Sequence, residues 1–239
     1  MTFVDEACEL YRARPHHILP YVGAAFRGAA PELLRILLVG INSHISAKDW
    51  DPAQNFPRPE WFTVWFENSS YRHNKRIHAE ATELLVGMTQ DRGPFAGRSF
   101  SWPESCYSTN AIKVHLPDDA GKRADQVGRS VFDEHVKTWH AELDLMAKHG
   151  VLPHVIAIFG RPFWSRACDS LRPQSAALYQ HLQVTKYQPS AGTALHFVNR
   201  VELADGNEPH EMLLVRLRHP CARTQVGSAR WLLAQPEFN

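Results

Sequence analysis

Residues 35–46 read Arg-Ile-Leu-Leu-Val-Gly-Ile-Asn-Ser-His-Ile-Ser. The apolar run at 36–39 is too short for a helix and rich in branched side chains, as is typical of a buried strand in a parallel sheet. Gly40 ends the run, and small polar residues follow, Asn42 first among them. Ligands in open α/β sheets bind outside the carboxyl ends of the strands, so Asn42 lies where such a fold places its chemistry. The alternative is that Asn42 and Ser43 only form a turn after the strand, since both residue types are common in turns.

Helical and strand patterns alternate outward from this run. We expect helices at 5–11, 17–26, 71–88, 131–148, from Pro162 onward, at 174–182 and at 224–233, and strands at 35–40, 106–114, 154–159, 194–203 and 211–218. This alternation predicts an α/β fold with a mostly parallel central sheet. We expect one three-layer α/β/α domain over residues 1–239, with a helical segment at 1–30 packed on it.

Composition excludes several classes of protein. A net charge of +1, with 44% hydrophobic and 21% charged residues, is that of an ordinary globular chain. No apolar run reaches membrane-spanning length, and the first residues lack the form of a signal peptide, so we expect a cytoplasmic protein, or a nuclear one in a eukaryote. The four cysteines are scattered, which argues against a zinc ribbon, an iron–sulfur cluster or a disulfide framework. Pairs of histidines lie five residues apart in the chain, whereas two zinc ligands on one face of a helix are four residues apart. We therefore expect no bound metal.

Three predicted strands carry polar residues at or near their carboxyl ends: Asn42, Asn110 and His219. Taken singly, each has an ordinary structural explanation, such as a turn or a satisfied backbone group. Together, at one edge of a sheet, they predict a pocket with two amides and an imidazole.

At this point the sequence resembles the uracil-DNA glycosylase superfamily. Residues 40–42, with Ser-Ala at 46–47, are similar to the first motif of its mismatch-specific and single-strand-selective branches. Thr-Asn-Ala-Ile-Lys at 109–113 resembles the central strand whose Asn reads the base. Residues 153–160 resemble the family's Pro-strand-Gly segment, and His-Pro-Cys-Ala-Arg at 219–223 resembles the second active-site motif. The ordered set covers about residues 33–230.

The chain departs from the family pattern at two motifs. Ser43-His44 stands where the family has Pro-Gly, and Cys221 stands where it has Ser. The cysteine-ligated cluster of the thermophile-type branch is absent from the sequence. These departures indicate a divergent branch, with a different target or with binding that is not followed by cleavage.

The resemblance implies a role for each matching residue. Asn42 would orient the attacking water, His219 would stabilise the departing base anion, and Asn110 would hydrogen-bond the base edge. An Asn cannot take a proton at neutral pH, so we expect a slower enzyme than one with Asp. Other residues implied in base binding are Ile41, Phe56, Trp61 and Phe62, with one aromatic ring stacking on a flipped base. Residues implied in DNA binding are His44, Ser46, Arg223 and Thr224.

The resemblance therefore predicts a monofunctional DNA glycosylase. It would act as a monomer without a cofactor and hydrolyse the N-glycosidic bond of uracil or a related damaged base. A non-catalytic nucleic-acid- or protein-binding module on the same fold is the alternative. A hydrolase of small nucleosides or nucleotides is a third hypothesis, because one fold hosts many functions.

Overall fold

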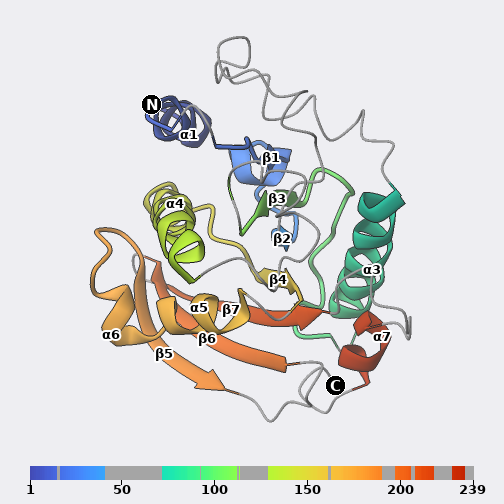
Figure 1. Cartoon of the computed structure of the whole chain (residues 1–239). Coiled ribbons are helices and arrows are strands. Elements are labelled where there is room, and N and C mark those ends of the chain that lie inside the picture. Colours follow the sequence, from blue (N-terminus) through green and yellow to red (C-terminus); the bar gives the residue numbers. More distant parts are fainter. Residues whose placement is uncertain are drawn as a thin grey trace.

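The structure is a computed structural model, shown in Figure 1. It describes residues 1–14, 17–40, 72–91, 93–111, 113, 129–160, 163–189, 197–205, 208–217 and 228–234.

Helices and strands alternate along most of the described chain, which confirms the prediction of an α/β protein. The helices are α1 (Phe3–Arg12), the 3-10 helix η1 (Ala24–Arg27), α3 (Arg72–Thr89), α4 (Arg129–Lys148), α5 (Trp164–Ser170), α6 (Pro173–Ala176) and α7 (Ser228–Leu233). The strands are β1 (Tyr21–Val22), β2 (Ile36–Gly40), β3 (Cys106–Asn110), β4 (Val155–Phe159), β5 (Gln183–Pro189), β6 (Phe197–Asp205) and β7 (Glu208–Leu217).

The strands form a single seven-stranded sheet in the order β1-β3-β2-β4-β7-β6-β5. The four central strands, β3, β2, β4 and β7, run parallel, as the sequence predicts. The outer pairings, β1 with β3, β7 with β6 and β6 with β5, are antiparallel, so the sheet is mixed rather than mostly parallel. A short connection explains one of them, because the two residues between Asp205 and Glu208 join β6 to β7 as a hairpin.

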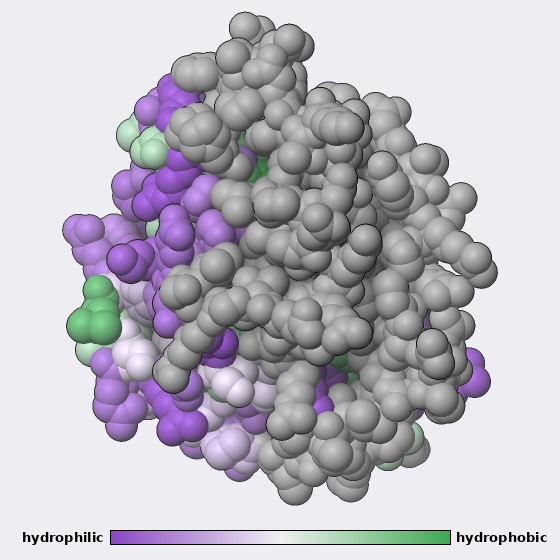
Figure 2. Space-filling model, in the orientation of Figure 1, coloured by the Kyte–Doolittle hydropathy of each residue, from purple (hydrophilic) through white to green (hydrophobic). Residues whose placement is uncertain are grey.

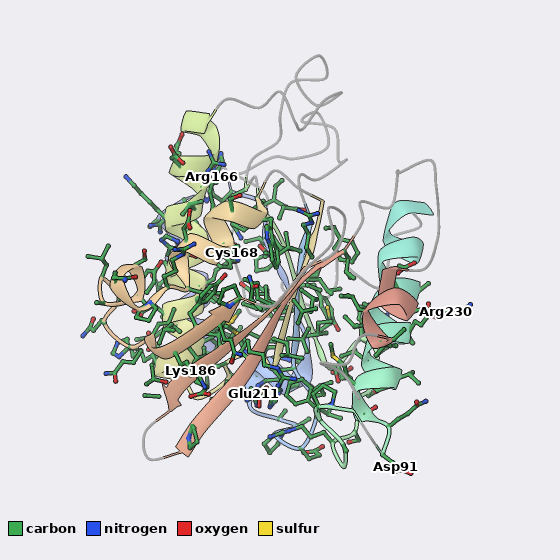
Figure 3. All side chains as sticks on the ribbon, turned by 90° about the horizontal axis from the view of Figure 1, so that it is seen from below. Asp91, Arg166, Cys168, Lys186, Glu211 and Arg230 are labelled. Carbon is green, nitrogen blue, oxygen red and sulfur yellow. The ribbon has the colours of Figure 1, made fainter. Side chains whose placement is uncertain are left out.

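Both faces of the central strands are buried under helices. Leu37 and Val39 of β2 belong to one core with residues of α1, α4 and α5, whereas Ile36 and Leu38 belong to a second core with residues of α3 and α7. Arg166 on α5 and Arg230 on α7 accordingly lie on opposite sides of the sheet (Figure 3). The unbroken apolar run of β2 therefore reflects a strand that is covered on both faces.

The surface of the described residues carries few large apolar side chains. Only Met1, Val86 and Leu178 are exposed among them, and the described part of the face seen in Figure 2 is mainly hydrophilic. Among the described helices, none combines the length and the apolar character needed to cross a membrane.

Two of the predicted helices are wrong. Residues 17–26 form strand β1 and helix η1, because Tyr21 and Val22 pair with β3 instead of continuing a helix. Residues 174–182 contain only the end of α6, after which the chain enters edge strand β5. The strand predicted at 106–114 ends at Asn110.

A buried histidine ties the amino ends of β2 and β4 together. His154 Nδ1 accepts a hydrogen bond from the Arg35 backbone N–H at 2.9 Å, and the His154 N–H donates to the Arg35 carbonyl at the same distance. Burial, with the positive charges of Arg35 and Arg98 and the nearby His210, lowers the pKa of His154 to about 2. The folded protein therefore holds this imidazole neutral, as the hydrogen bond to Nδ1 requires.

We predict that His154 makes the protein sensitive to acid. Below about pH 6.5 the unfolded chain binds a proton at this residue and the folded chain does not. The free energy of unfolding should then fall by roughly 1 kcal/mol per pH unit from this group alone. Urea unfolding between pH 7 and pH 4.5 should give a shallower pH dependence for His154→Asn than for the wild type. Equal slopes would contradict the prediction.

Candidate functional site

The carboxyl ends of the four parallel strands meet at one edge of the sheet. Gly40 pairs with Asn110 in register, and Phe159 pairs with Leu217. Directly beyond the strand ends, the Ala111 N–H donates to the Gly40 carbonyl at 2.8 Å, and the Gly160 N–H donates to the Leu217 carbonyl at 2.9 Å. This is the edge at which open α/β sheets bind their ligands.

Of the predicted site residues, Asn110 is the one that the structure describes. The others lie outside the described residues: Asn42, His219, Ile41, His44, Ser46, Phe56, Trp61, Phe62, Arg223 and Thr224. In the chain, Asn42 follows the last residue of β2 by two positions, and His219 follows the last residue of β7 by two positions. The described sheet thus places the preceding strand of each predicted catalytic residue at the edge that carries Asn110.

Asn110 lies against a glycine that makes room for its side chain. A Cβ atom at residue 40 would be 2.8 Å from Asn110 Oδ1, closer than real Cβ atoms approach an oxygen. Gly40 and Asn110 are cross-strand neighbours on the same face, and the Asn110 side chain is partly exposed there. Gly40 therefore does more than end an apolar run, because the absence of a side chain there leaves room for Asn110 Oδ1.

A buried polar network lies beneath the carboxyl end of β3. Glu142 of α4 is 2% exposed, and its Oε1 accepts hydrogen bonds from Tyr11 OH at 2.5 Å and Tyr107 OH at 2.7 Å. Lys113 is 0% exposed and donates from Nζ to Glu142 Oε2 at 2.5 Å and to Thr109 Oγ1. One carboxylate thus joins α1, β3, the residues after β3 and α4.

Burial and neighbouring charges shift the pKa values of three groups in this network, Tyr11, Tyr107 and Lys113. Burial, reinforced by the charge of Glu142, raises the pKa of Tyr11 and of Tyr107 well above the ordinary value, so both hydroxyls remain donors. Burial lowers the pKa of Lys113, and the Glu142 carboxylate opposes that shift. The Lys113 amine is closed to solvent and engaged with two acceptors.

Lys113 was predicted only as part of the motif at 109–113, and Glu142 was not predicted. A signal for Glu142 was present, because it shares a helix face with the apolar residues Trp139, Leu143 and Met146. A charged residue on a buried helical stripe needs a buried partner. Nothing in the sequence named that partner, since Lys113 lies 29 positions away in the chain.

Two histidines lie next to this network on the α4 side. His17 Nδ1 and Thr138 Oγ1 are 3.2 Å apart, and the ring of His17 meets that of His135 edge to face at 5.2 Å. Burial lowers the pKa of His135, with partial opposition from Glu134. The neighbouring Ile18 N–H donates to the Lys113 carbonyl at 2.5 Å, so this segment also fixes the backbone at Lys113.

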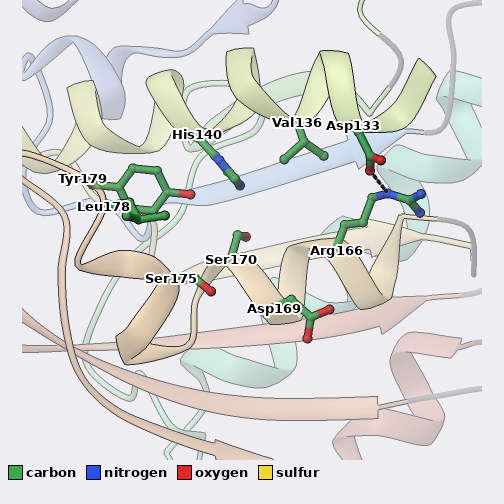
Figure 4. A pocket seen from close by; sticks show the side chains of 9 residues that line it. All are labelled: Asp133, Val136, His140, Arg166, Asp169, Ser170, Ser175, Leu178 and Tyr179. Carbon is green, nitrogen blue, oxygen red and sulfur yellow. Dashed lines mark hydrogen bonds and ion pairs between the residues drawn. The ribbon is translucent and has the colours of Figure 1, made fainter. Parts of the chain in front are cut away.

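A separate hollow of about 300 Å³ lies between α4 and the α5–α6 segment (Figure 4). His140 points into it, with Nε2 buried and without a hydrogen-bond partner among the described residues, and burial lowers its pKa to about 4. Arg166 and Asp133 form an ion pair at 3.0 Å on its wall. The hollow contains none of the predicted site residues.

Metal and thiol chemistry find little support in the part of the chain that the structure describes. No three His, Cys, Asp or Glu side chains are grouped there to hold a metal ion. The described cysteines, Cys8, Cys106 and Cys168, are buried thiols that form no disulfide. Burial raises the pKa of Cys106, and it raises that of Cys168 to about 11, so these two thiols stay protonated at neutral pH.

The chain matches no protein-family model, no curated protein and no solved structure.

We predict that Gly40→Ala displaces the Asn110 side chain while leaving the fold intact. The new methyl group meets the far end of a side chain rather than backbone, so the Asn110 amide can rotate away. In a ¹⁵N spectrum, the side-chain NH₂ signal of Asn110 should shift strongly, whereas signals of α4 should stay in place. Unfolding of Gly40→Ala, or an unmoved Asn110 signal, would contradict the geometry.

We also predict that Lys113→Met destabilises the protein by about 3 kcal/mol, because it leaves the Glu142 carboxylate buried without its cation. The double variant Lys113→Met/Glu142→Gln should recover most of this loss, since Gln still accepts from the two tyrosines. Denaturant unfolding of the three proteins measures both steps. A double variant that is no more stable than Lys113→Met would show that the charges are not coupled.

Proposed function

We propose that this chain is a DNA glycosylase-like protein that hydrolyses the N-glycosidic bond of uracil or a related damaged base in DNA. The observation that carries the proposal is the common carboxyl edge of β2, β3 and β7, with the Asn110 amide lying on it across Gly40. In this proposal the helices on both faces of the sheet correspond to the three-layer architecture of the uracil-DNA glycosylase superfamily.

The proposed reaction develops positive charge on the sugar and negative charge on the departing base. Asn42, two positions beyond β2, would orient the attacking water through its amide oxygen. His219, two positions beyond β7, would donate a hydrogen bond to the base oxygen that gains the charge. These roles rest on the sequence motifs and on the place of the two preceding strands in the sheet.

Asn110 would read the base. A carboxamide offers one acceptor and two donor hydrogens, which match the ring N–H and the exocyclic oxygen of uracil. A base with a different edge would leave these groups unpaired, and polar readout discriminates in this way. Its position at the end of a buried parallel strand, against Gly40, supports this role, since rigid elements hold recognition groups in place.

The proposed enzyme is monofunctional. The Lys113 amine, which lies in the motif that contains Asn110, is buried and bound to Glu142 and so is not available to attack the sugar. As the resemblance implies, a water molecule is the proposed nucleophile, and the product is an abasic site in an uncut strand.

The direct test is an alkaline-cleavage gel assay on single- and double-stranded oligonucleotides that contain uracil, hydroxymethyluracil or hypoxanthine. We expect cleavage by the wild type to depend on the alkali step, and Asn42→Ala and His219→Ala each to lose about 10²- to 10³-fold in rate. Lys186→Ala, on exposed strand β5, is the matched control and should keep the wild-type rate. If all substrates remain uncut by the wild type, the enzymatic proposal is wrong.

A non-catalytic binding module on the same fold is the second candidate. The near-neutral net charge of +1 and Ser43-His44 in place of Pro-Gly favour it. This candidate predicts that nucleic-acid or protein binding survives the double variant Asn42→Ala/His219→Ala. Loss of a cleavage activity in that double variant would exclude it.

A further inference from the structure

We propose that Lys113 and Glu142 are positioning residues that hold Asn110 in register for reading the base. This inference rests on the proposed function, because it assigns a task to the buried network in that same site. Neither residue would touch the base. They would act through the backbone on both sides of Asn110.

The network ties down the chain immediately before and after Asn110. Thr109 precedes it, and its Oγ1 accepts a hydrogen bond from Lys113 Nζ. Lys113 follows it by three positions and is bound twice, by its amine to Glu142 and by its carbonyl to the Ile18 N–H. Between these anchors, the Ala111 N–H is bound to the Gly40 carbonyl. The residue that presents the amide is thus held from α4, from β2 and from the segment after α1.

Stability alone does not require an ion pair at this place. Buried charge pairs can often be replaced by apolar residues without loss of stability. In this chain the pair fixes Lys113, which lies three residues after Asn110, the one described side chain at the proposed base site. A displacement of about 1 Å at a recognition group can reduce turnover by about 10²-fold. The proposed task of the network is to keep Asn110 from such a displacement.

The test compares Lys113→Met/Glu142→Gln with Lys148→Met. The control breaks a second lysine–glutamate bridge, Lys148 to Glu6 at 2.6 Å, which also joins α4 to α1 but is partly exposed to solvent. We expect kcat/KM on a uracil oligonucleotide to fall 10- to 100-fold in the double variant and less than twofold in the control.

A second substrate separates positioning from loss of folded protein. An oligonucleotide with a tetrahydrofuran abasic analogue has no base for Asn110 to read. The wild type and the double variant should bind this analogue with the same affinity. Partial unfolding of the double variant would instead weaken its binding to the uracil oligonucleotide and to the analogue equally. Equal losses on the two oligonucleotides would overturn the proposal.

A double-mutant cycle with Asn110→Ala identifies the residue through which the network acts. If the network works through Asn110, adding Lys113→Met/Glu142→Gln to Asn110→Ala should reduce kcat/KM less than twofold further. Additive losses would show that Lys113 and Glu142 act by another route, and the inference would fail.

Spectroscopy distinguishes failure of this inference from failure of the proposed function. If the wild type neither cleaves nor binds a base-containing substrate, the proposed function is wrong and the kinetic test has no baseline. The Asn110 side-chain NH₂ signal should still shift or broaden in Lys113→Met/Glu142→Gln and stay unchanged in Lys148→Met. An identical Asn110 signal in all three proteins would refute the positioning role whatever the activity.

Discussion

Four donors from three segments of the chain converge on one buried carboxylate, that of Glu142. Tyr11 comes from α1, Tyr107 and Thr109 come from β3, and Lys113 comes from the residues that follow β3. Loss of this carboxylate would remove a buried acceptor from each of these donors and would cost stability, although Lys113 would keep its bond to Thr109 Oγ1. A single side chain therefore holds α1, α4 and the end of β3 together. Asn110 lies at that strand end.

The parallel centre of the sheet supplies the rest of the site. Helices cover both faces of β2 and β4, so the side chains within these strands are apolar and unsuited to polar chemistry. Among the described residues of these neighbouring strands, the Asn110 amide lies at a strand end, where Gly40 leaves room for its oxygen. The hollow beside His140 is lined by residues of α4 and of the α5–α6 segment, so it is separate from the strand ends.

The sequence predicts the central strands well because each is a short apolar run with a clear end. It fails for β1 and β5, where local pattern is weak: Tyr21-Val22 pairs over two residues, and β5 is an exposed edge strand with polar side chains. Asn110 was identified from its motif. The ion pair between Lys113 and Glu142 could not be predicted from the sequence. The two residues are 29 positions apart, and their contact is fixed by how α4 packs on the sheet, which leaves no local sequence pattern.

The central claim is that a nucleobase binds at the edge formed by Gly40 and Asn110. The most direct measurement is a ¹⁵N titration of the wild type with an oligonucleotide that carries 2′-fluoro-deoxyuridine, whose electron-withdrawing fluorine slows cleavage. We predict that the Asn110 side-chain signal and the backbone amides of Gly40 and Ala111 shift together, while those of His140 and Tyr179 in the separate hollow do not. Shifts confined to the hollow, or none at the strand ends, would contradict the account.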